Sequence, residues 1–407
     1  MFSASRGLFE KRQTGRMRSI RLAAVFLACI SIGSTAGCAA VGQALHVAGA
    51  PSGPVTLEIG DVVDTSSGDV ITFEDMMGRL SRASVVYIGE IHTSPEDHGA
   101  QLSILRRLAT GGGCIEMGME MFPRTAQPVL DRYVGGEMTE EQFLKEVHWD
   151  QVWGFPYRLY RPLIDFAREN HIRILGLNAP QNVIRKIAHE GLASLTPEER
   201  AQVARDFHLD DPKNRARILE EYNAHGKHEI KDFESFFAAQ LGWEETMAET
   251  IADRLNQTGG QCRIVVILGK GHISEQLGVP YLTAMRVPAE YKTVAPVPIN
   301  YPFSTLDPDL AEYVMLTDKS EPVRRPRLGV TVQPAASGKG AEILGIMPEM
   351  PAAKAGILKG DVIVSIDDRP VAGAEEIQRI LAEGGPDYEV VVQRGKKRVT
   401  VEVTIGR

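Results

Sequence analysis

The sequence predicts an α/β protein with a mostly parallel sheet that is flanked by helices and carries a helical insertion, followed by a second, β-rich domain. Two observations support this fold class. Apolar runs rich in β-branched residues alternate with helical segments between residues 85 and 268, which is the pattern of parallel strands buried on both faces. Beyond residue 326 the chain is compact and β-rich, and its 407 residues suffice for two cores.

The N-terminal segment predicts a lipoprotein signal peptide over residues 1–38. Arg16, Arg18 and Arg21 precede the apolar run Leu22–Ile32, which is too short to span a bilayer as a permanent helix. The segment ends in Thr35–Cys38, which resembles a bacterial lipobox and implies acylation of Cys38. Ordinary secretory cleavage near Ala39–Ala40 is the alternative.

These features imply a cell-envelope address, in which a lipid anchor holds the protein to a membrane. Ala39 stands where an aspartate would favour inner-membrane retention, so we expect the outer membrane rather than the inner one. Residues 39–54 are small and predict a flexible tether. The formal net charge of -8, without a basic stripe, argues against nucleic acid as a partner.

The domain predicted over residues 55–318 begins with a hairpin. Residues 55–71 alternate apolar and polar positions around Asp64–Gly68, and Thr72 then opens a short helix with an acidic first turn. Four strands follow, with a helical insertion over about 181–257. The predicted strands are Val85–Ile88, Cys114–Met121, Ile172–Leu177 and Ile264–Leu268.

Cys114 and Cys262 each open one of these strands. Buried thiols without a chemical role are the favoured interpretation, because free cysteine is among the most buried residue types. A disulfide between them is the alternative in an oxidising compartment, but their spacing does not establish one.

Two of the predicted strands end in the same short motif, a glycine followed three residues later by a histidine. Gly89 leads to His92, and Gly269 leads to His272. Ligands bind beyond the carboxyl ends of the strands in open α/β sheets. The motifs therefore predict two imidazoles in one crevice, ready for a ligand or a metal ion.

Two glutamates extend this candidate site. Glu90 lies inside the first motif, and Glu120 lies near the carboxyl end of its strand, whereas Glu116 lies earlier and is expected to be structural. Glu90, His92 and His272 would suit a transition metal such as Mn or Zn as N and O ligands. The two histidines with Glu90 and Glu120 would equally serve general acid–base chemistry on a bound carbonyl.

Further polar residues are candidates for cofactor binding. His98 and Gln101 share one helical face with buried leucines, although capping of the first turn explains them equally well. Asn178 ends a strand, where it either faces the crevice or forms a turn. Gln240 and Glu244 interrupt an apolar helical stripe, which predicts that they line the site or pair with a buried base.

An aromatic-rich stretch over residues 149–160 contains Tyr157 and Tyr160, three residues apart on one helix edge. Core packing is the favoured interpretation of such a cluster, because aromatic side chains dominate core burial. A tyrosine phenolate can also ligate haem iron, which makes both tyrosines candidate ligands.

Several motifs follow one another along the chain: Gly89–His92 with His98 and Gln101, Gly118–Phe122, Tyr157–Pro162, Leu177–Pro180, Gln240 with Met247–Ala248, and Gly269–His272. Together they resemble the ChaN-like haem-binding uptake lipoproteins of the Tiki and erythromycin-esterase superfamily. The resemblance covers residues 55–318 and implies binding of haem or iron, with haem held by Tyr or His between two copies of the chain. It also implies kinship with metal-dependent proteases and esterases that use two such histidines and a glutamate.

A linker over residues 319–326 precedes the last domain, residues 327–407. Its motifs Pro351–Gly356 and Gly360–Ile363 resemble the central signature of a PDZ domain of the bacterial protease type. Such domains add an extended peptide as a strand, so the resemblance implies docking of a peptide or protein C-terminus. Its carboxylate-binding loop would consist of Arg327, Leu328, Gly329 and Val330. No Gly-x-Ser-x-Gly nucleophile motif precedes this domain in the sequence.

The favoured function is therefore that of a membrane-anchored lipoprotein that binds haem, with the PDZ domain recruiting a partner. The alternative is a metal-dependent hydrolase, a peptidase or esterase, that uses Glu90, His92, Glu120 and His272. A tether that uses only the PDZ domain would leave the buried polar cluster unexplained.

Overall fold

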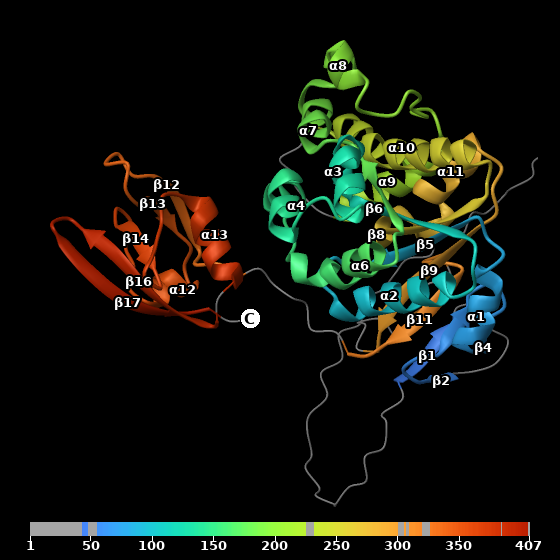
Figure 1. Cartoon of the computed structure of the whole chain (residues 1–407), viewed down its shortest axis with the longest axis horizontal. Helices are drawn as coiled ribbons and strands as arrows, with labels where there is room; N and C mark the ends of the chain where they lie inside the picture. The colour runs from blue at the N-terminus through green and yellow to red at the C-terminus, as the bar shows by residue number, and fades with distance from the viewer. Residues whose placement is uncertain are drawn as a thin grey trace, which may run out of the picture. The chain divides into compact units, whose positions relative to one another are not determined.

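The computed structural model describes residues 43–47, 55–224, 232–299, 305–306, 309–319, 326–383 and 385–405. The predicted signal peptide and Cys38 lie outside these residues. The described residues form an α/β domain and a smaller β-rich domain (Figure 1). No helix in the described ranges is both long and apolar enough to cross a membrane.

An eight-stranded sheet organises the α/β domain, with the strand order β4-β3-β11-β9-β5-β8-β6-β7. The six strands from β11 to β7 run parallel, and the β3–β4 hairpin pairs antiparallel with β11 at one edge. This sheet confirms the predicted fold class. Its strands are β3 (Val62–Asp64), β4 (Asp69–Ile71), β5 (Val85–Glu90), β6 (Cys114–Pro123), β7 (Arg173–Asn178), β8 (Cys262–Gly269), β9 (Tyr291–Pro298) and β11 (Tyr313–Thr317).

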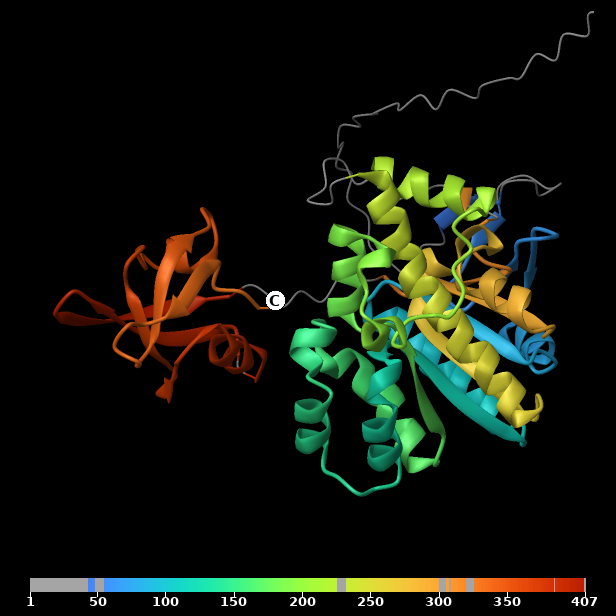
Figure 2. The same ribbon diagram turned by 90° about the horizontal axis from the view of Figure 1, so that it is seen from above.

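Helices cover both faces of this sheet (Figure 2). The first face carries α1 (Phe73–Leu80), α2 (Pro95–Ala109), α3 (Gln127–Val134), α4 (Glu140–Glu146), α5 (Trp149–Val152) and α6 (Tyr157–Glu169). The predicted insertion is helical and contains α7 (Gln181–Glu190), α8 (Pro197–Arg200), α9 (Pro212–Ala224) and α10 (Phe233–Thr258). After β8 the chain forms α11 (Val279–Arg286), which with α9 and α10 packs on the second face.

The two cores follow from strand geometry, because successive side chains of a strand point to opposite faces. Val86 and Ile88 of β5 pack into the core with α1, α2 and α6. Val85 and Tyr87 of the same strand pack into the opposite core with α10 and α11. A strand that is buried on both faces needs apolar residues at every position, which is why the sequence shows a continuous run there.

Local signals set the ends of the helices. Thr72 caps α1 by accepting a hydrogen bond from the backbone N–H of Asp75, and Asp75 completes a capping box. This confirms the predicted helix start. α10 ends at Gly259, whose left-handed φ of 58° suits glycine at a helix C-terminus.

A small three-stranded sheet includes part of the segment that was predicted to be a tether. β1 (Gln43–Val47) pairs antiparallel with β2 (Val55–Leu57) and parallel with β10 (Thr305–Leu306). Part of the segment 39–54 is thus a strand, because its backbone finds partners that are distant in the sequence. The predicted hairpin of residues 55–71 is reduced to β3 and β4.

The β-rich domain contains an antiparallel sheet and two helices around a core of its own. The sheet order β12-β13-β14-β16-β17, with β15 beside β14, confirms that this domain is β-rich, as predicted. Its strands are β12 (Val330–Pro334), β13 (Ala341–Ile346), β14 (Val362–Ile366), β15 (Arg369–Pro370), β16 (Asp387–Arg394) and β17 (Lys397–Thr404). The helices are α12 (Pro351–Lys354) and α13 (Ala374–Glu383).

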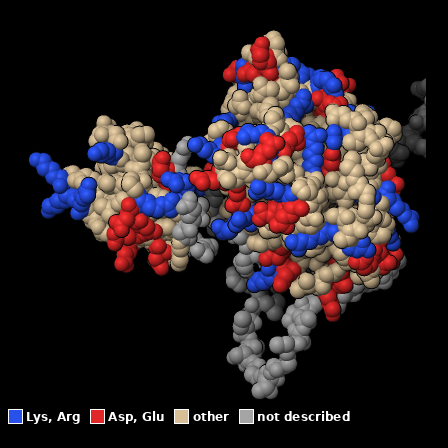
Figure 3. Space-filling view, in the orientation of Figure 1, with Lys and Arg blue, Asp and Glu red and all other residues tan. Residues whose placement is uncertain are grey.

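Acidic and basic side chains are interspersed over the face of the α/β domain that Figure 3 shows. Many form ion pairs between neighbouring elements, such as Arg107 with Glu74 and Arg173 with Asp131. Such exposed pairs contribute about 0–1 kcal/mol each to stability.

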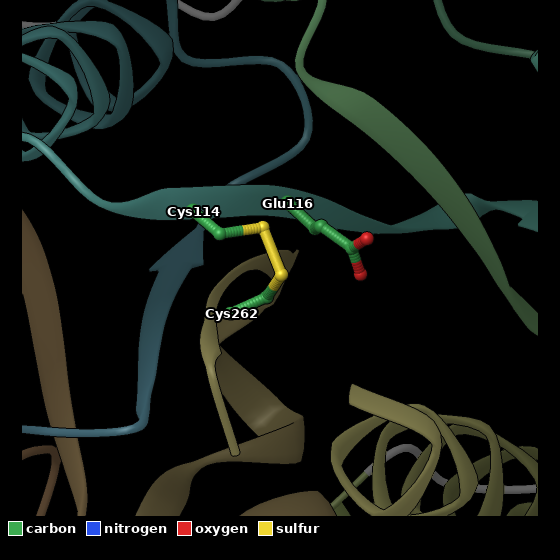
Figure 4. Close-up of side chains that lie close together, drawn as sticks. All are labelled: Cys114, Glu116 and Cys262. Carbon is green, nitrogen blue, oxygen red and sulfur yellow. A yellow bond between two sulfur atoms is a disulfide. The ribbon is translucent and has the colours of Figure 1, made fainter. Parts of the chain in front are cut away.

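Cys114 and Cys262 form a disulfide, which corrects the preference for buried free thiols (Figure 4). They stand opposite each other at the starts of β6 and β8, with their Cα atoms 4.4 Å apart. Cys114 is exposed and Cys262 is half-buried. Their separation of 148 residues concealed the pairing in the sequence, since only the strand order makes them neighbours. Glu116 next to them receives a 2.6 Å hydrogen bond from Arg254 Nε, which agrees with its predicted structural role.

We expect the disulfide to stabilise the α/β domain by about 2–4 kcal/mol, because it closes a long loop in the unfolded chain. Urea unfolding of the full chain, with and without the double substitution Cys114→Ser and Cys262→Ser, measures this difference. Wild-type protein in a dithiol reductant should match the double variant. Equal unfolding midpoints for the oxidised and serine forms would contradict a stabilising bridge.

Candidate functional site

A cavity of about 290 Å³ lies at the carboxyl ends of β5, β6, β7 and β8. Both motif histidines line it, together with Glu120, as the two Gly-x-x-His turns predicted. This placement follows from the parallel register, which sets Glu90 opposite Gly269 so that both turns leave the sheet at one level. The full lining is His92, Glu120, Met121, Pro123, Val152, Trp153, Phe155, Asn178, Ala179, Gln181, Gln240, Trp243 and His272.

The glycine of each motif leaves room for a residue of the other motif. A Cβ atom at Gly269 would lie 3.0 Å from Cε1 of His92. A Cβ atom at Gly89 would lie 2.9 Å from Cγ of Lys270 and 2.8 Å from Cδ1 of Ile273. The two turns therefore interlock, and this close approach explains why both motifs need glycine.

Glu90 is a fully buried carboxylate behind His92. Its Oε1 accepts hydrogen bonds from the Tyr160 hydroxyl at 2.6 Å and from His92 Nδ1 at 2.8 Å. Its Oε2 accepts from Gln101 Nε2 at 2.8 Å and lies 3.2 Å from His98 Nδ1. Burial alone would raise the pKa of Glu90, but the charges and hydrogen bonds of the two histidines outweigh burial and lower it.

These contacts place Glu90 behind the cavity wall. The carboxylate does not line the cavity, and donors engage both of its oxygens. It instead fixes the ring of His92 through Nδ1. The sequence placed Glu90 in the motif correctly but did not reveal which way its side chain points.

Most of the predicted cofactor-binding residues lie behind the cavity wall. Tyr160 is fully buried, and burial together with Glu90 raises the pKa of its hydroxyl, so a phenolate ligand is disfavoured. His98 and Gln101 are buried beside Glu90. Tyr157 packs edge-on against Trp149, with ring centroids 5.2 Å apart, and does not line the cavity.

Asn178 and Gln240 do line the cavity. The Nδ2 of Asn178 donates to the Glu120 carbonyl at 3.1 Å, and its Oδ1 accepts from the Ala179 N–H at 2.8 Å. Asn178 therefore ties the end of β7 to β6, which combines the two interpretations that the sequence left open.

The second histidine is held by two carboxylates. His272 lies in the short 3-10 turn η3 (Lys270–His272) after β8. Its Nδ1 is 3.0 Å from Oε1 of Glu244, and its Nε2 is 3.4 Å from Oε1 of Glu120. Oε2 of Glu120 accepts the Gly269 N–H at 2.6 Å. Glu244 thus pairs with a buried base, as the interrupted helical stripe predicted.

The charges of the cavity follow from these contacts. Burial lowers the pKa of His272, but Glu120 and Glu244 outweigh burial and raise it to about 10. The pKa of His92 is also raised, because its hydrogen bond to Glu90 and the charge of Glu120 exceed the effect of burial. The ring of His272 therefore favours the imidazolium form at neutral pH.

Lys270 and Asp97 couple the two turns, a role that sequence reasoning missed. Lys270 Nζ donates to Oδ2 of Asp97 at 2.7 Å, and the same oxygen accepts the Ile91 N–H at 2.8 Å. Burial raises the pKa of Asp97 and lowers that of Lys270, although the ion pair opposes both shifts. In the sequence, the charged residue Lys270 inside the second motif could have indicated such an ion pair. Its partner, Asp97, can be identified only from the fold.

Aromatic side chains form one wall of the cavity. The rings of Trp153 and Phe155 lie 4.8 Å and 4.9 Å from the ring of His92, between centroids. Trp243 of α10 contributes a further aromatic surface. Trp149 is buried in the core, as was expected for the whole stretch, whereas Trp153 and Phe155 face the cavity.

Among the described residues, one group of three metal-type ligands has its ligand atoms within 4.8 Å of one another, namely Cys114, Glu116 and Cys262 (Figure 4). Its two sulfur atoms are joined in the disulfide, so they are not free to bind a metal. His92, Glu120 and His272 all line the cavity, but their ligand atoms do not all lie within this distance of one another.

The β-rich domain has a groove between β12 and α13. It is lined by residues that include Val330, Val332, Met347, Ile377 and Leu381. The loop Arg327–Val330, predicted to bind a carboxylate, leads into β12 at this groove. Gly329 has a left-handed φ of 79°, and a Cβ atom there would collide with Met350. The loop conformation therefore requires glycine.

Comparisons with known proteins agree with this division. Residues 76–282 match the family model described as haem-binding uptake, Tiki superfamily, ChaN, and residues 326–405 match the PDZ domain model. The structure of ChaN of Campylobacter jejuni, reported with cofacial heme binding, aligns with 62% of this chain and 95% of its own length. The TM-score is 0.51 and the identity is 19%, which shows a shared fold.

Two curated relatives match parts of the chain. The chloroplastic protein RETICULATA-RELATED 5 of Arabidopsis thaliana is 26% identical over 242 residues, covering 53% of this chain and 31% of that protein. The serine endoprotease DegS of Escherichia coli is 39% identical over 69 residues, covering 16% of this chain and 19% of DegS. The chain thus spans less than a third of the length of either relative. The similarity to such endoproteases concerns the PDZ domain alone.

We expect the contribution of His272 to stability to depend on pH. Its folded pKa of about 10 lies above the ordinary value of 6.5, so the charged ring stabilises the fold fully below pH 6.5. This contribution disappears as the pH rises through about 10. The difference in unfolding free energy between wild type and His272→Gln, measured in urea, should shrink between pH 6.5 and pH 10.

His189→Gln is a matched control, because His189 is exposed at the end of α7. A difference between wild type and His272→Gln that stays constant across this pH range would contradict the assignment of a charged His272.

Proposed function

The chain belongs to the haem-binding uptake family of the Tiki superfamily that ChaN represents, and from this premise we propose that the cavity between its two histidine turns binds haem. We propose further that the PDZ domain docks the C-terminal end of a peptide or protein, while an acylated Cys38 anchors the chain to a membrane. One observation carries the haem proposal: His92 is fixed by buried Glu90 and borders an aromatic-walled cavity.

The residues around the cavity fit a haem in their chemistry. Histidines that ligate metals commonly bond a carboxylate through the other ring nitrogen, as His92 Nδ1 does with Glu90. This leaves Nε2 of His92 as the nitrogen that would bind the haem iron, because imidazole is a common ligand of haem iron. Trp153, Phe155 and Trp243 offer flat apolar surfaces that suit a porphyrin ring. When bound, haem would supply the iron centre, and the chain would supply its orientation and shielding from water.

The alternative is a metal-dependent peptidase or esterase. It is favoured by the second carboxylate–imidazole pair, Glu244 with His272, and by Glu120 between the two histidines. His92, His272 and Glu120 would then hold a divalent ion such as Mn or Zn, after small movements that bring their ligand atoms together. The interpretation as a haem site needs one imidazole only, which is why we prefer it.

Two observations support a location in the cell envelope. The N-terminal sequence has the order expected of a lipoprotein signal, with Cys38 at its end. The disulfide between Cys114 and Cys262 suits an oxidising compartment outside the cytoplasm. We propose the outer membrane as its address, and acyl labelling of wild type and Cys38→Ser, followed by membrane fractionation, tests this.

We expect purified full-length protein to bind haemin with a shifted Soret band. His92→Ala should weaken this binding at least about tenfold, which corresponds to ~1.4 kcal/mol, because the nitrogen that would bind the iron is lost. His189→Ala should bind as wild type does. Light scattering of the haem complex tests the proposed homodimer.

Two outcomes would contradict the haem site. One is an unchanged Soret band and affinity in the His92→Ala variant. The other is the absence of haem binding together with Mn²⁺- or Zn²⁺-dependent peptide or ester cleavage that His92→Ala and His272→Ala both abolish. The second outcome would favour the hydrolase.

We expect the PDZ domain to bind a peptide with a free, apolar C-terminus at least about tenfold more tightly than the same peptide with an amidated end, because a loop that captures a chain end recognises its charged carboxylate. Fluorescence anisotropy with labelled peptides measures both affinities in the full chain. Equal affinities for the two forms would contradict capture of a chain end.

A further inference from the structure

Helix α9 of the insertion carries a buried arginine that reaches the second histidine turn. The side chain of Arg217 is 2% exposed. Its Nη2 donates to Oε2 of Glu244 at 2.6 Å, and its Nη1 donates to the carbonyl oxygen of Gly271 at 3.1 Å. One guanidinium therefore bonds both the carboxylate that holds His272 and the backbone next to His272.

The contacts around His272 form a row of alternating charges. Arg217 bonds Glu244, Glu244 bonds His272 Nδ1, and His272 Nε2 faces Glu120. Glu244 is fully buried, and a buried carboxylate is costly unless cations and hydrogen bonds surround it. Arg217 occupies the side of Glu244 that His272 does not, so it allows Glu244 to stay ionised while it shares the imidazole with Glu120.

A second residue of α9 supports the same turn from its far end. Oδ1 of Asn214 accepts the Gly278 N–H at 3.3 Å. A Cβ atom at Gly278 would lie 2.5 Å from the His272 carbonyl oxygen and 3.4 Å from Oε1 of Glu244. The segment from Gly271 to Gly278 is thus held at both ends by one helix, which fixes the backbone that carries His272.

The two histidines are supported in different ways. Glu90 behind His92 receives the neutral donors Tyr160 and Gln101 in addition to the two imidazoles. Glu244 behind His272 receives a guanidinium from the insertion. Of these two supports, the one behind His272 therefore comes from the helical insertion.

We propose that Arg217 is a positioning residue that sets the ring orientation and hydrogen bonding of His272, so that the insertion shapes the ligand cavity from behind. The inference rests on the proposed haem-binding function for its effect on affinity. Its structural part concerns His272 itself and does not depend on the identity of the ligand.

The test compares Arg217→Gln and Arg217→Lys with Arg215→Gln in the full chain. Arg215 is the matched control, because it lies on the same helix but pairs with exposed Glu234. We expect Arg217→Gln to move the ¹⁵N ring signals of His272 at a fixed pH. It should weaken haemin binding by up to about fivefold, less than His92→Ala does, because His272 lines the cavity beside the proposed ligand His92. Arg217→Lys should restore most of both properties, and Arg215→Gln should change neither.

A folded Arg217→Gln protein with wild-type His272 signals and wild-type haemin affinity would overturn the proposal. If Arg217→Gln does not fold, the double variant Arg217→Met with Glu244→Gln removes both buried charges, and unchanged His272 signals in it would likewise overturn the proposal. If wild type binds no haemin, the proposed function fails, but the His272 signals still decide the role of Arg217.

Discussion

Two buried carboxylates, Glu90 and Glu244, each hold one histidine of the cavity by its Nδ1 atom. Ionised carboxylates persist in a protein interior only when donors surround them. Those donors come from several elements: α2 and α6 serve Glu90, and α9 serves Glu244. Helices on both faces of the sheet thus help to set the orientation of the two imidazole rings, because they supply the donors that hold the two carboxylates.

The parallel sheet supplies the second constraint. Neighbouring parallel strands end at the same edge, so β5 and β8 deliver their histidine turns to one place. Glycine at the start of each turn then allows the turns to touch, and the Lys270–Asp97 ion pair joins them from behind. The spacing of the two histidines is therefore a property of the sheet and the interlocked turns, rather than of either motif alone.

The PDZ domain and the disulfide extend this picture beyond the cavity. The PDZ domain has its own core, separate from the two cores that flank the sheet of the histidine site. The disulfide lies at the amino ends of β6 and β8, while the cavity lies at their carboxyl ends. The disulfide and the cavity thus lie at opposite ends of the same strands. Substitution of the cysteines is therefore expected to change stability without removing a residue of the cavity.

The sequence by itself determined the fold class, the two domains and the convergence of His92 and His272, because strand periodicity and glycine turns are local signals. Only the tertiary structure decided that Tyr160 is buried behind Glu90 and that Arg217 supports Glu244. Side-chain direction and long-range partners depend on how separate elements pack, and no local pattern records that packing. The same reason explains the disulfide, whose cysteines become neighbours only through the order of the strands.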